Sequence, residues 1–200
     1  MTEVASARAP VTGQELYQIL HDIEQRAVAR AAGLPGQHPP EVAWEGVLFS
    51  VGGRSLVTSL GDVKEILNYP RAITAVPGTK PWVKGIANIR GNLISVIDLQ
   101  AFLFGRLTVP GRRSRVLVAE QEGFPSGLLV DAMVGIRHFR PSDRIEHPAG
   151  VAEVLRPFVE AAFLHGGEQW PVFNMGRLLA NKEFPRSAFV LLSWPLPQAP

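Results

Sequence analysis

The sequence predicts an all-β fold, a barrel or a sandwich, for most of the chain. After Trp44 it consists of short apolar segments rich in valine, isoleucine, leucine and phenylalanine, which is the composition of strands. Glycine-rich turns separate the segments, as in barrels and sandwiches built from hairpins. Of the 200 residues, 46% are hydrophobic and 19% are charged, so the chain can bury a core and is not disordered as a whole.

Four hairpins are predicted from pairs of apolar segments that face each other across a glycine-containing turn. The pairs are WEGVLFSV with RSLVTSL across Gly52-Gly53, WVKGIANI with LISVIDL across Arg90-Gly91-Asn92, SRVLVAEQ with SGLLVDAMVGI around Gly123, and FVEAAFLH with QWPVFNM across Gly166-Gly167. Between the hairpins we expect a short turn or helix at GDVKEIL, a stretch broken by three prolines at PRAITAVPGTKP, and one or two helical turns at MGRLLANKEF.

A helix is predicted ahead of the hairpins, and its apolar face is expected to pack on the β domain. Apolar residues recur there at helical spacing, and Thr12 with Glu15 has the form of a capping box. The segment PGQHPPEVA that follows has the composition of a linker. We therefore expect three parts: a helix and linker over 1–43, a β domain over 44–184, and an apolar tail over 185–200 that is either a docked strand or a free tail.

The sequence offers little support for an enzyme. It has no cysteine, no phosphate-binding glycine loop, no nucleophile elbow and no paired-histidine metal motif. Its five histidines are scattered without the spacing of metal ligands, so we expect neither a metal nor another cofactor. One alternative stays open: His21, on the predicted helix, could serve phosphotransfer, although the lysine-glycine pair usual after such a histidine is missing.

Charge and hydropathy bear on the possible partners. The formal net charge is only +2, with acids and bases interspersed, which does not favour nucleic-acid binding. No apolar run reaches the roughly 18 residues that a membrane span requires, so direct membrane insertion is not expected. The N-terminus also lacks the apolar core of a signal peptide. We therefore expect a cytoplasmic protein.

Two groups of polar residues each allow two interpretations. Asp98 and Asp131 each close an apolar strand, and they are either a carboxylate pair for acid–base chemistry or caps of the turn or helix that follows. Capping is the better account, because no other catalytic feature lies near them in the sequence. Arg112, Arg113 and Arg115 form a small basic cluster, either a solvated loop or a contact for an anionic group, and we favour the solvated loop.

The segment VKGIANIRGNLISVIDL is the most unusual, because it places an Arg-Gly pair within the most apolar part of the chain. Gly91 fits a hairpin turn that needs a positive φ. Gly85, in mid-strand, indicates a bulge or the close approach of another backbone. Together with Arg90 at the turn, these residues suit a strand pair whose end is offered to a partner.

The same segment resembles the signature of CheW-type chemotaxis coupling proteins. In that family an Ile/Val-Lys/Arg-Gly-x-x-Asn-Leu/Ile-Arg-Gly sequence precedes an apolar strand that ends in Asp-Leu. The V-x-E-I element at Val63, Glu65 and Ile66, the Val-Asp in GLLVDAMVGI and the closing FLHGGEQWPVFNMGRLL agree with the family's order. The resemblance runs from Trp44 to Phe184. The leading helix that ends in AAGLP and the WVKG start resemble members from pilus-associated systems, which control twitching motility.

The resemblance implies two five-stranded SH3-like barrels that share a core. It implies a scaffold, not an enzyme: an adaptor in two-component signal transduction that links the cytoplasmic tip of a methyl-accepting chemoreceptor to the regulatory domain of a CheA-type histidine kinase, in arrays at the inner membrane. A CheW-like inhibitor or scaffold outside a kinase array is the alternative. By resemblance, receptor binding falls to Val63, Glu65, Ile66, Gly85, Ile89, Arg90 and Gly91, and kinase binding to Val130, Asp131 and Met133.

One contact follows from the resemblance. In the family, the V-x-E-I element and the Arg-Gly turn lie side by side on the first barrel. For this sequence the arrangement places Glu65 beside Arg90, and we expect the two to form an ion pair at the rim of the receptor-facing groove.

Overall fold

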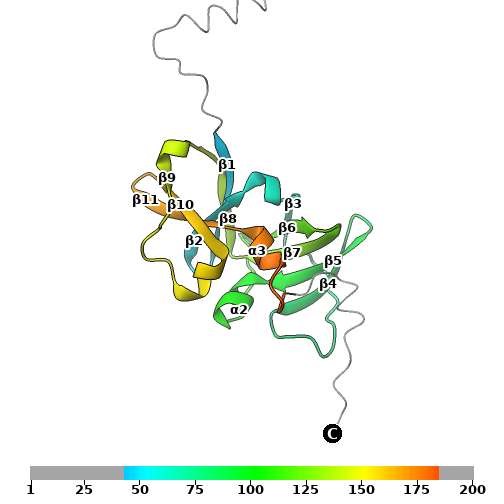
Figure 1. The fold of residues 1–200 in the computed structure, drawn as a ribbon. Coiled ribbons are helices and arrows are strands. Elements are labelled where there is room, and N and C mark those ends of the chain that lie inside the picture. Colours follow the sequence, from blue (N-terminus) through cyan, green and yellow to red (C-terminus); the bar gives the residue numbers. More distant parts are fainter. Residues whose placement is uncertain (1–42, 185–200) are drawn as a thin grey trace, which may run out of the picture. The chain divides into compact units, whose positions relative to one another are not determined.

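The structure is a computed structural model, and it describes residues 43–184 (Figure 1). The predicted N-terminal helix with His21, its expected docking, and the apolar tail lie outside the described residues. The strands are β1 Trp44–Val51, β2 Arg54–Ser59, β3 Glu65–Asn68, β4 Val83–Ile89, β5 Asn92–Asp98, β6 Arg115–Gln121, β7 Phe124–Val130, β8 Ala132–Phe139, β9 Arg144–Ile145, β10 Val159–His165 and β11 Glu168–Phe173. The helices are α2 Leu99–Phe104 and α3 Met175–Leu179, with 3₁₀ turns η1 Leu60–Asp62, η2 Pro141–Asp143 and η3 Glu153–Phe158.

The strands form two curled sheets, which confirms the predicted all-β fold. One sheet has six strands in the order β8-β1-β2-β11-β10-β9, and its last member, β9, has only two residues. The other has five strands in the order β3-β6-β7-β5-β4. The middle of the chain makes the five-stranded sheet, while the six-stranded sheet takes strands from both sides of it (Figure 1).

All four predicted hairpins are present, and each turns through two residues with positive φ. The pairs are Gly52 and Gly53, Arg90 and Gly91, Glu122 and Gly123, and Gly166 and Gly167. Positive φ at both central residues is the geometry of the type I′ turn, whose twist matches that of the flanking strands. Arg90 adopts this geometry although it carries a side chain, which is uncommon.

Two segments differ from the sequence prediction. The segment GDVKEIL does not end in a helix, because Glu65–Asn68 forms strand β3 after the short turn η1. Ile66 faces one apolar cluster and Leu67 faces another, so the sequence lacks the alternation of apolar and polar residues that predicts a strand. The segment SGLLVDAMVGI is not one strand, since it breaks at Asp131 into β7 and β8, which belong to different sheets.

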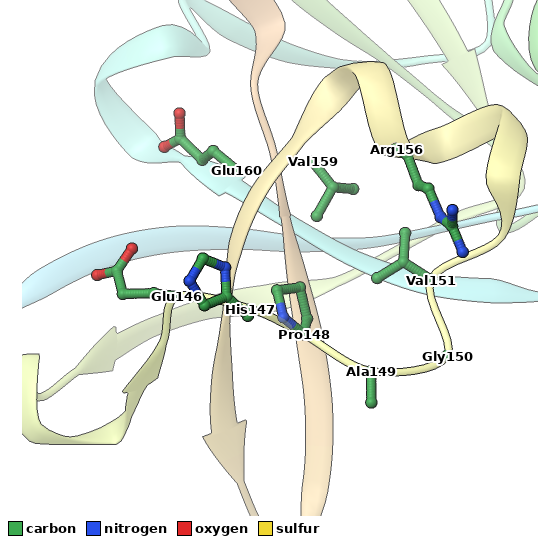
Figure 2. Close-up of a pocket in the computed structure, with 9 residues that line it drawn as sticks. All are labelled: Glu146, His147, Pro148, Ala149, Gly150, Val151, Arg156, Val159 and Glu160. Carbon is green, nitrogen blue, oxygen red and sulfur yellow. The ribbon is translucent and has the colours of Figure 1, made fainter.

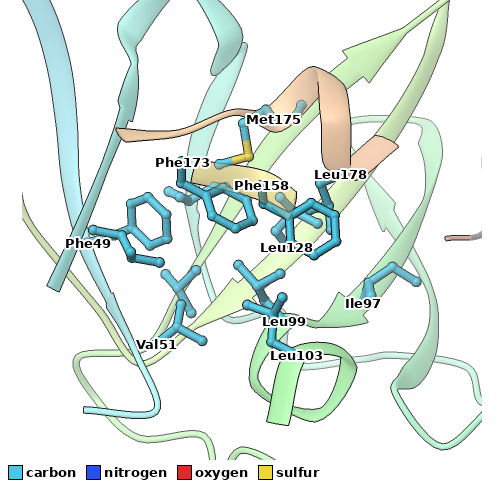
Figure 3. Packing of buried hydrophobic residues seen from close by; sticks show 14 of the residues in the cluster. Phe49, Val51, Ile97, Leu99, Leu103, Leu128, Phe158, Phe173, Met175 and Leu178 are labelled. Carbon is cyan, nitrogen blue, oxygen red and sulfur yellow. The ribbon is translucent and has the colours of Figure 1, made fainter. Parts of the chain in front are cut away.

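A single large core joins the two sheets (Figure 3). Phe49 from the six-stranded sheet and Leu128 from the five-stranded sheet are both fully buried in it. The ring of Phe173 meets that of Phe49 edge to face, with 6.2 Å between the ring centroids. It also packs against the ring of Phe158 of η3, with 5.7 Å between the centroids. The short helices close the core, with Leu99 and Leu103 from α2 and Met175 and Leu178 from α3.

Asp98 is fully buried at the end of β5 and anchors the chain that follows. Its Oδ1 accepts hydrogen bonds from the Ala101 amide at 3.1 Å and from the Thr108 hydroxyl at 2.7 Å, while Oδ2 accepts one from the Thr108 amide at 2.8 Å. The Lys84 ammonium lies 3.7 Å from Oδ2 and offsets the buried charge. The expected cap is therefore confirmed: Asp98 is the N-cap of α2.

Replacing this carboxylate should destabilise the fold. The change Asp98→Ala leaves the amides of Ala101 and Thr108 and the Thr108 hydroxyl without acceptors in a buried site, and we expect a loss of about 2–4 kcal/mol in the free energy of unfolding. Urea denaturation followed by tryptophan fluorescence measures the loss. The control is Asp143→Ala, whose half-buried residue makes only one long side-chain hydrogen bond, from the Ser142 hydroxyl at 3.5 Å, and it should change stability by no more than about 0.5 kcal/mol. Equal effects from the two substitutions would contradict the anchoring role.

Candidate functional site

The predicted ion pair is present and spans the seam of the five-stranded sheet. Strands β3 and β4 are its opposite edges, yet the sheet curls until Arg90, in the turn after β4, reaches Glu65 on β3. Arg90 Nη1 lies 2.7 Å from Glu65 Oε1. The side chains are 78% and 30% exposed, so the pair lies at the surface, where a partner can reach it.

Half-buried aliphatic side chains flank the ion pair. Val63 and Ile66 pack against the large shared core, and Ile89 packs against a smaller cluster inside the five-stranded sheet. Each keeps part of its surface exposed. Charges at a rim with apolar surface beside them are typical of protein-binding sites, in which apolar contact supplies affinity and charge sets the choice of partner.

The turn that carries Arg90 is held from within. Asn88 accepts a hydrogen bond from the Gly91 amide on its Oδ1, at 2.9 Å, and the φ values of Arg90 and Gly91 are +52° and +90°. Sequence reasoning missed Asn88. An asparagine three residues before a turn glycine is a usable signal, since its side chain can mimic a backbone acceptor.

Gly85 is buried, so its part in this region is internal. A Cβ on Gly85 would lie 2.1 Å from the Thr74 carbonyl oxygen. Thr74 exchanges two backbone hydrogen bonds with Ile86, which adds a short bridge to the edge strand β4. The pairing of β4 with β5 also shifts register between Val83 and Gly85. The sequence therefore predicted both the bulge and the close approach, but the approaching backbone belongs to this chain.

The residues expected to bind the kinase lie where the chain passes from one sheet to the other. Val130 is fully buried in the shared core, so its side chain is not available to a partner, whereas Asp131 and Met133 are half-buried. Asp131 Oδ2 accepts a hydrogen bond from the Gly53 amide at 3.2 Å, and the Asp131 amide donates to the Ser50 carbonyl at 2.9 Å. Asp131 was expected to cap the turn or helix that follows it, and this was wrong: its carboxylate caps the distant turn between β1 and β2.

The two candidate regions lie at opposite ends of paired strands. Strands β5 and β7 run parallel, with Ser95 opposite Ser126 and Asp98 opposite Leu129. The Arg90 turn precedes β5, while Asp131 follows β7. A strand of this length spans on the order of 20 Å. The two candidate regions are therefore separated by about the length of these strands.

The described residues contain little that suggests other chemistry. A hollow of about 460 Å³ is lined by the loop 146–151 and by Arg156, Val159 and Glu160, and it contains none of the candidate residues (Figure 2). Within residues 43–184, no three histidine or acidic side chains come together as metal ligands would. In the same range no helix is long and apolar enough to cross a membrane.

Two curled sheets around one core, with a charged and apolar surface at the seam, define a protein-binding adaptor. The comparison with protein families specifies which. The CheW-like domain family matches residues 45–183, and the chain belongs to that family. Membership places it among the scaffolding and coupling proteins of chemosensory signalling.

Individual relatives agree with this assignment. Protein PilI of Pseudomonas aeruginosa is 39% identical over 171 residues, which cover 86% of this chain and 95% of the relative. The chemotaxis protein CheW of Rhizobium meliloti is 32% identical over 137 residues, covering 68% and 88%. The crystal structure of the scaffolding protein TtCheW from Thermoanaerobacter tengcongensis is similar with a TM-score of 0.61 at 26% identity, covering 71% of this chain and 96% of that one.

Substitution with alanine distinguishes the structural roles of Gly85 and Gly91. Gly85→Ala should cost at least about 2 kcal/mol, because its Cβ would collide with the Thr74 carbonyl and the backbone there has a positive φ. Gly91→Ala meets no atom but is strained by its φ of +90°, and should cost about 1 kcal/mol. Gly111→Ala, in open space, is the control. Urea denaturation ranks the three proteins by their free energy of unfolding. A Gly85→Ala protein as stable as the control would contradict the close approach of the Thr74 backbone to Gly85.

Stability should depend on pH through Asp62, which immediately precedes the candidate receptor site. Burial, and secondly the negative charge of Glu160, raise the pKa of Asp62 above its usual value. A raised pKa means that folding favours the protonated carboxyl, so this stabilising contribution is complete below about pH 3.9 and disappears as the pH rises through the folded-state pKa. Asp62→Asn should therefore melt at a higher temperature than the wild type at pH 7.

The control for this prediction repeats the Asp62→Asn substitution in a protein that also carries Glu160→Gln. In Glu160→Gln the charge repulsion is gone, so Asp62→Asn should raise the melting temperature by less. The gain at pH 7 should also shrink as the pH falls through the folded-state pKa and be lost well below the unfolded pKa of about 3.9. A gain that is the same at both pH values would show that Asp62 acts by something other than its charge.

Proposed function

We propose that the chain couples the cytoplasmic tip of a methyl-accepting chemoreceptor to a CheA-type histidine kinase, in a pilus-associated system that controls twitching motility. The observation that carries the proposal is the Arg90–Glu65 ion pair, held at the seam of a CheW-like fold by the segment that resembles the family's signature. The match to Protein PilI along 95% of that protein favours the pilus system. In such a system the chain acts at the inner membrane, in receptor arrays.

The receptor side is the surface around the ion pair. Val63, Ile66 and Ile89 supply partly exposed aliphatic surface for the apolar residues of a helical receptor tip. Arg90 and Glu65 fix the register of that helix. Gly91 permits the turn, and Gly85, near the other end of β4, lets the segment around Thr74 lie close to that strand.

The kinase side is the crossover between the two sheets. Asp131 and Met133 offer surface there, while Val130 positions them from the core. The hydrogen bond from the Gly53 amide to Asp131 ties this surface to the β1–β2 turn. A kinase domain bound at the crossover would leave the Arg90 turn free, because the two lie at opposite ends of β5 and β7.

A reconstituted mixture separates this function from its alternatives. The chain is combined with a pilus-system kinase, radiolabelled ATP and a receptor cytoplasmic fragment, and kinase autophosphorylation is measured. An adaptor raises the kinase's response to receptor and carries no label itself. A chain that lowers kinase output is the inhibitor, and a chain that becomes labelled at His21 is the phosphotransfer protein.

The ion pair should matter more for binding than for folding. A partly exposed pair contributes about 0–1 kcal/mol to stability, so Arg90→Ala should leave the melting temperature nearly unchanged. Desolvating Glu65 without its partner at an interface costs on the order of 2–5 kcal/mol, so receptor-dependent kinase activation should weaken at least about tenfold. Titration of the receptor fragment in the kinase assay measures the change.

Two further variants complete this test. Arg144→Ala removes the cation of a surface pair on the other sheet, at 2.8 Å from Glu146, and should couple normally. The double reversal Glu65→Arg with Arg90→Glu should recover part of the lost coupling if the pair itself is recognised. Normal coupling by Arg90→Ala would rule out the proposed receptor site.

A further inference from the structure

The loop between α2 and β6 carries an unexplained concentration of positive charge. From Leu99 to Ala119 the sequence contains four arginines and no aspartate or glutamate. We call residues 105–115 the arginine loop. The sequence left open whether its arginines are only solvated or contact an anion, and the proposed coupling function does not use them.

One of the four arginines serves the loop itself. Arg115 donates from Nη1 to the carbonyls of Arg112, at 3.0 Å, and of Ser114, at 2.8 Å. The other three, Arg106, Arg112 and Arg113, are exposed. Among residues 43–184, none of these three forms an ion pair with a carboxylate. The surface of the loop is therefore cationic, and the charge is not neutralised by the described part of the chain.

The buried anchor at Asp98 also forces apolar side chains outward. Thr108 turns inward to make two hydrogen bonds with Asp98 and is only 6% exposed. Its neighbours therefore point away from the core, and Leu107 is 57% and Val109 91% exposed. Two aliphatic side chains are thereby held in water between the arginines, so the loop presents apolar surface beside its positive charge.

The loop is fixed although it has no regular secondary structure. Gly105 ends α2 in the left-handed conformation and donates to the Ala101 carbonyl at 2.9 Å. Ser114 Oγ accepts from the Gly111 amide at 2.9 Å, and the Ser114 amide donates to the Gly111 carbonyl at 3.1 Å. Together with the two hydrogen bonds from Thr108 to Asp98, these bonds hold both ends and the middle of the arginine loop. A preorganised loop loses little entropy when a partner binds.

We propose that the arginine loop is a docking surface for an acidic protein segment in which carboxylates flank apolar side chains. The guanidinium groups pair with the carboxylates, for which their fork geometry is suited, and Leu107 with Val109 receives the apolar side chains. This contact is additional to the receptor and kinase contacts proposed above and does not depend on them. It is also distant from the Arg90 turn, because the loop follows the opposite end of β5.

Protein carboxylates fit the loop better than the phosphates of a nucleic acid or a membrane. The loop has no aromatic side chain to stack on bases or to anchor in a membrane interface. Its exposed aliphatic residues would gain nothing from a phosphate backbone. All of its cations are arginine, whose fork makes paired contacts with carboxylate or phosphate, so the exposed Leu107 and Val109 decide in favour of a protein segment.

The test uses the full chain and a fluorescein-labelled peptide that repeats the block Glu-Glu-Leu-Leu-Glu-Glu. Fluorescence anisotropy should show binding that weakens when salt is raised to about 0.5 M, since screening reduces charge attraction. Arg112→Glu with Arg113→Glu should weaken binding at least about tenfold. The matched control, Arg137→Glu with Arg140→Glu on the six-stranded-sheet side, makes the same charge change on exposed residues and should bind normally.

Further variants and a vesicle probe test the apolar contact, the charge contact and the choice of partner separately. Leu107→Ser with Val109→Ser changes no charge and should weaken binding severalfold, whereas unchanged binding would overturn the proposed apolar contact. Arg112→Gln with Arg113→Gln replaces the glutamate variant if that variant does not fold. The proposal also fails if the peptide does not bind, if the control pair loses binding equally, or if vesicles of phosphatidylglycerol and phosphatidylcholine bind the wild type through these arginines while the peptide does not.

Discussion

The apolar core shared by the two sheets is the constraint on which the rest of the structure depends. Each sheet encloses a smaller cluster of its own, but Phe49 from one sheet and Leu128 from the other lie together in the largest cluster. Their common burial fixes how one sheet faces the other, while the pairing of β5 with β7 inside one sheet fixes the distance between the Arg90 turn and the Asp131 crossover. The coupling function proposed above would depend on this fixed geometry, because it assigns one partner to each of the two regions.

Buried and exposed charged groups have different roles in this structure. Asp98 is enclosed and fully bonded, and it determines the path of the chain after β5. Glu65 and Arg90 are partly exposed, contribute little to folding and remain available to a partner. The same anchor at Asp98 that secures Thr108 also presents Leu107 and Val109 to solvent, so a stabilising interaction in the interior shapes the surface outside it.

Much of this arrangement could be predicted from the sequence, and the failures have physical causes. The hairpins followed from glycines, because few residues other than glycine tolerate the positive φ of a tight turn. The Glu65–Arg90 pair followed from the family resemblance and not from spacing, since the two residues lie on opposite edges of one sheet. Strand β3 was missed because each of its faces carries one polar and one apolar residue, so no alternation marks it. The break at Asp131 was missed because no proline or glycine marks it.

The candidate binding residues were predicted less well than the strands that carry them. A strand alternates its side chains between two faces, so a motif can identify the right strand while individual members point inward. Val130 is such a case, directed to the core while Asp131 and Met133 reach the surface. Gly85 is another, because its partner Thr74 lies in a proline-broken stretch that gives no sign of pairing with β4.

The order of strands along the chain has a consequence for how the protein is made. The five-stranded sheet comes from one continuous stretch, β3 to β7, whereas β1 must find β8, and β2 must find β11, only after that stretch is complete. Contacts between residues distant in sequence form slowly. During synthesis the β1–β2 hairpin therefore waits with Phe49 and Val57 uncovered while the middle sheet assembles. A nascent chain at this stage is at its most vulnerable to aggregation.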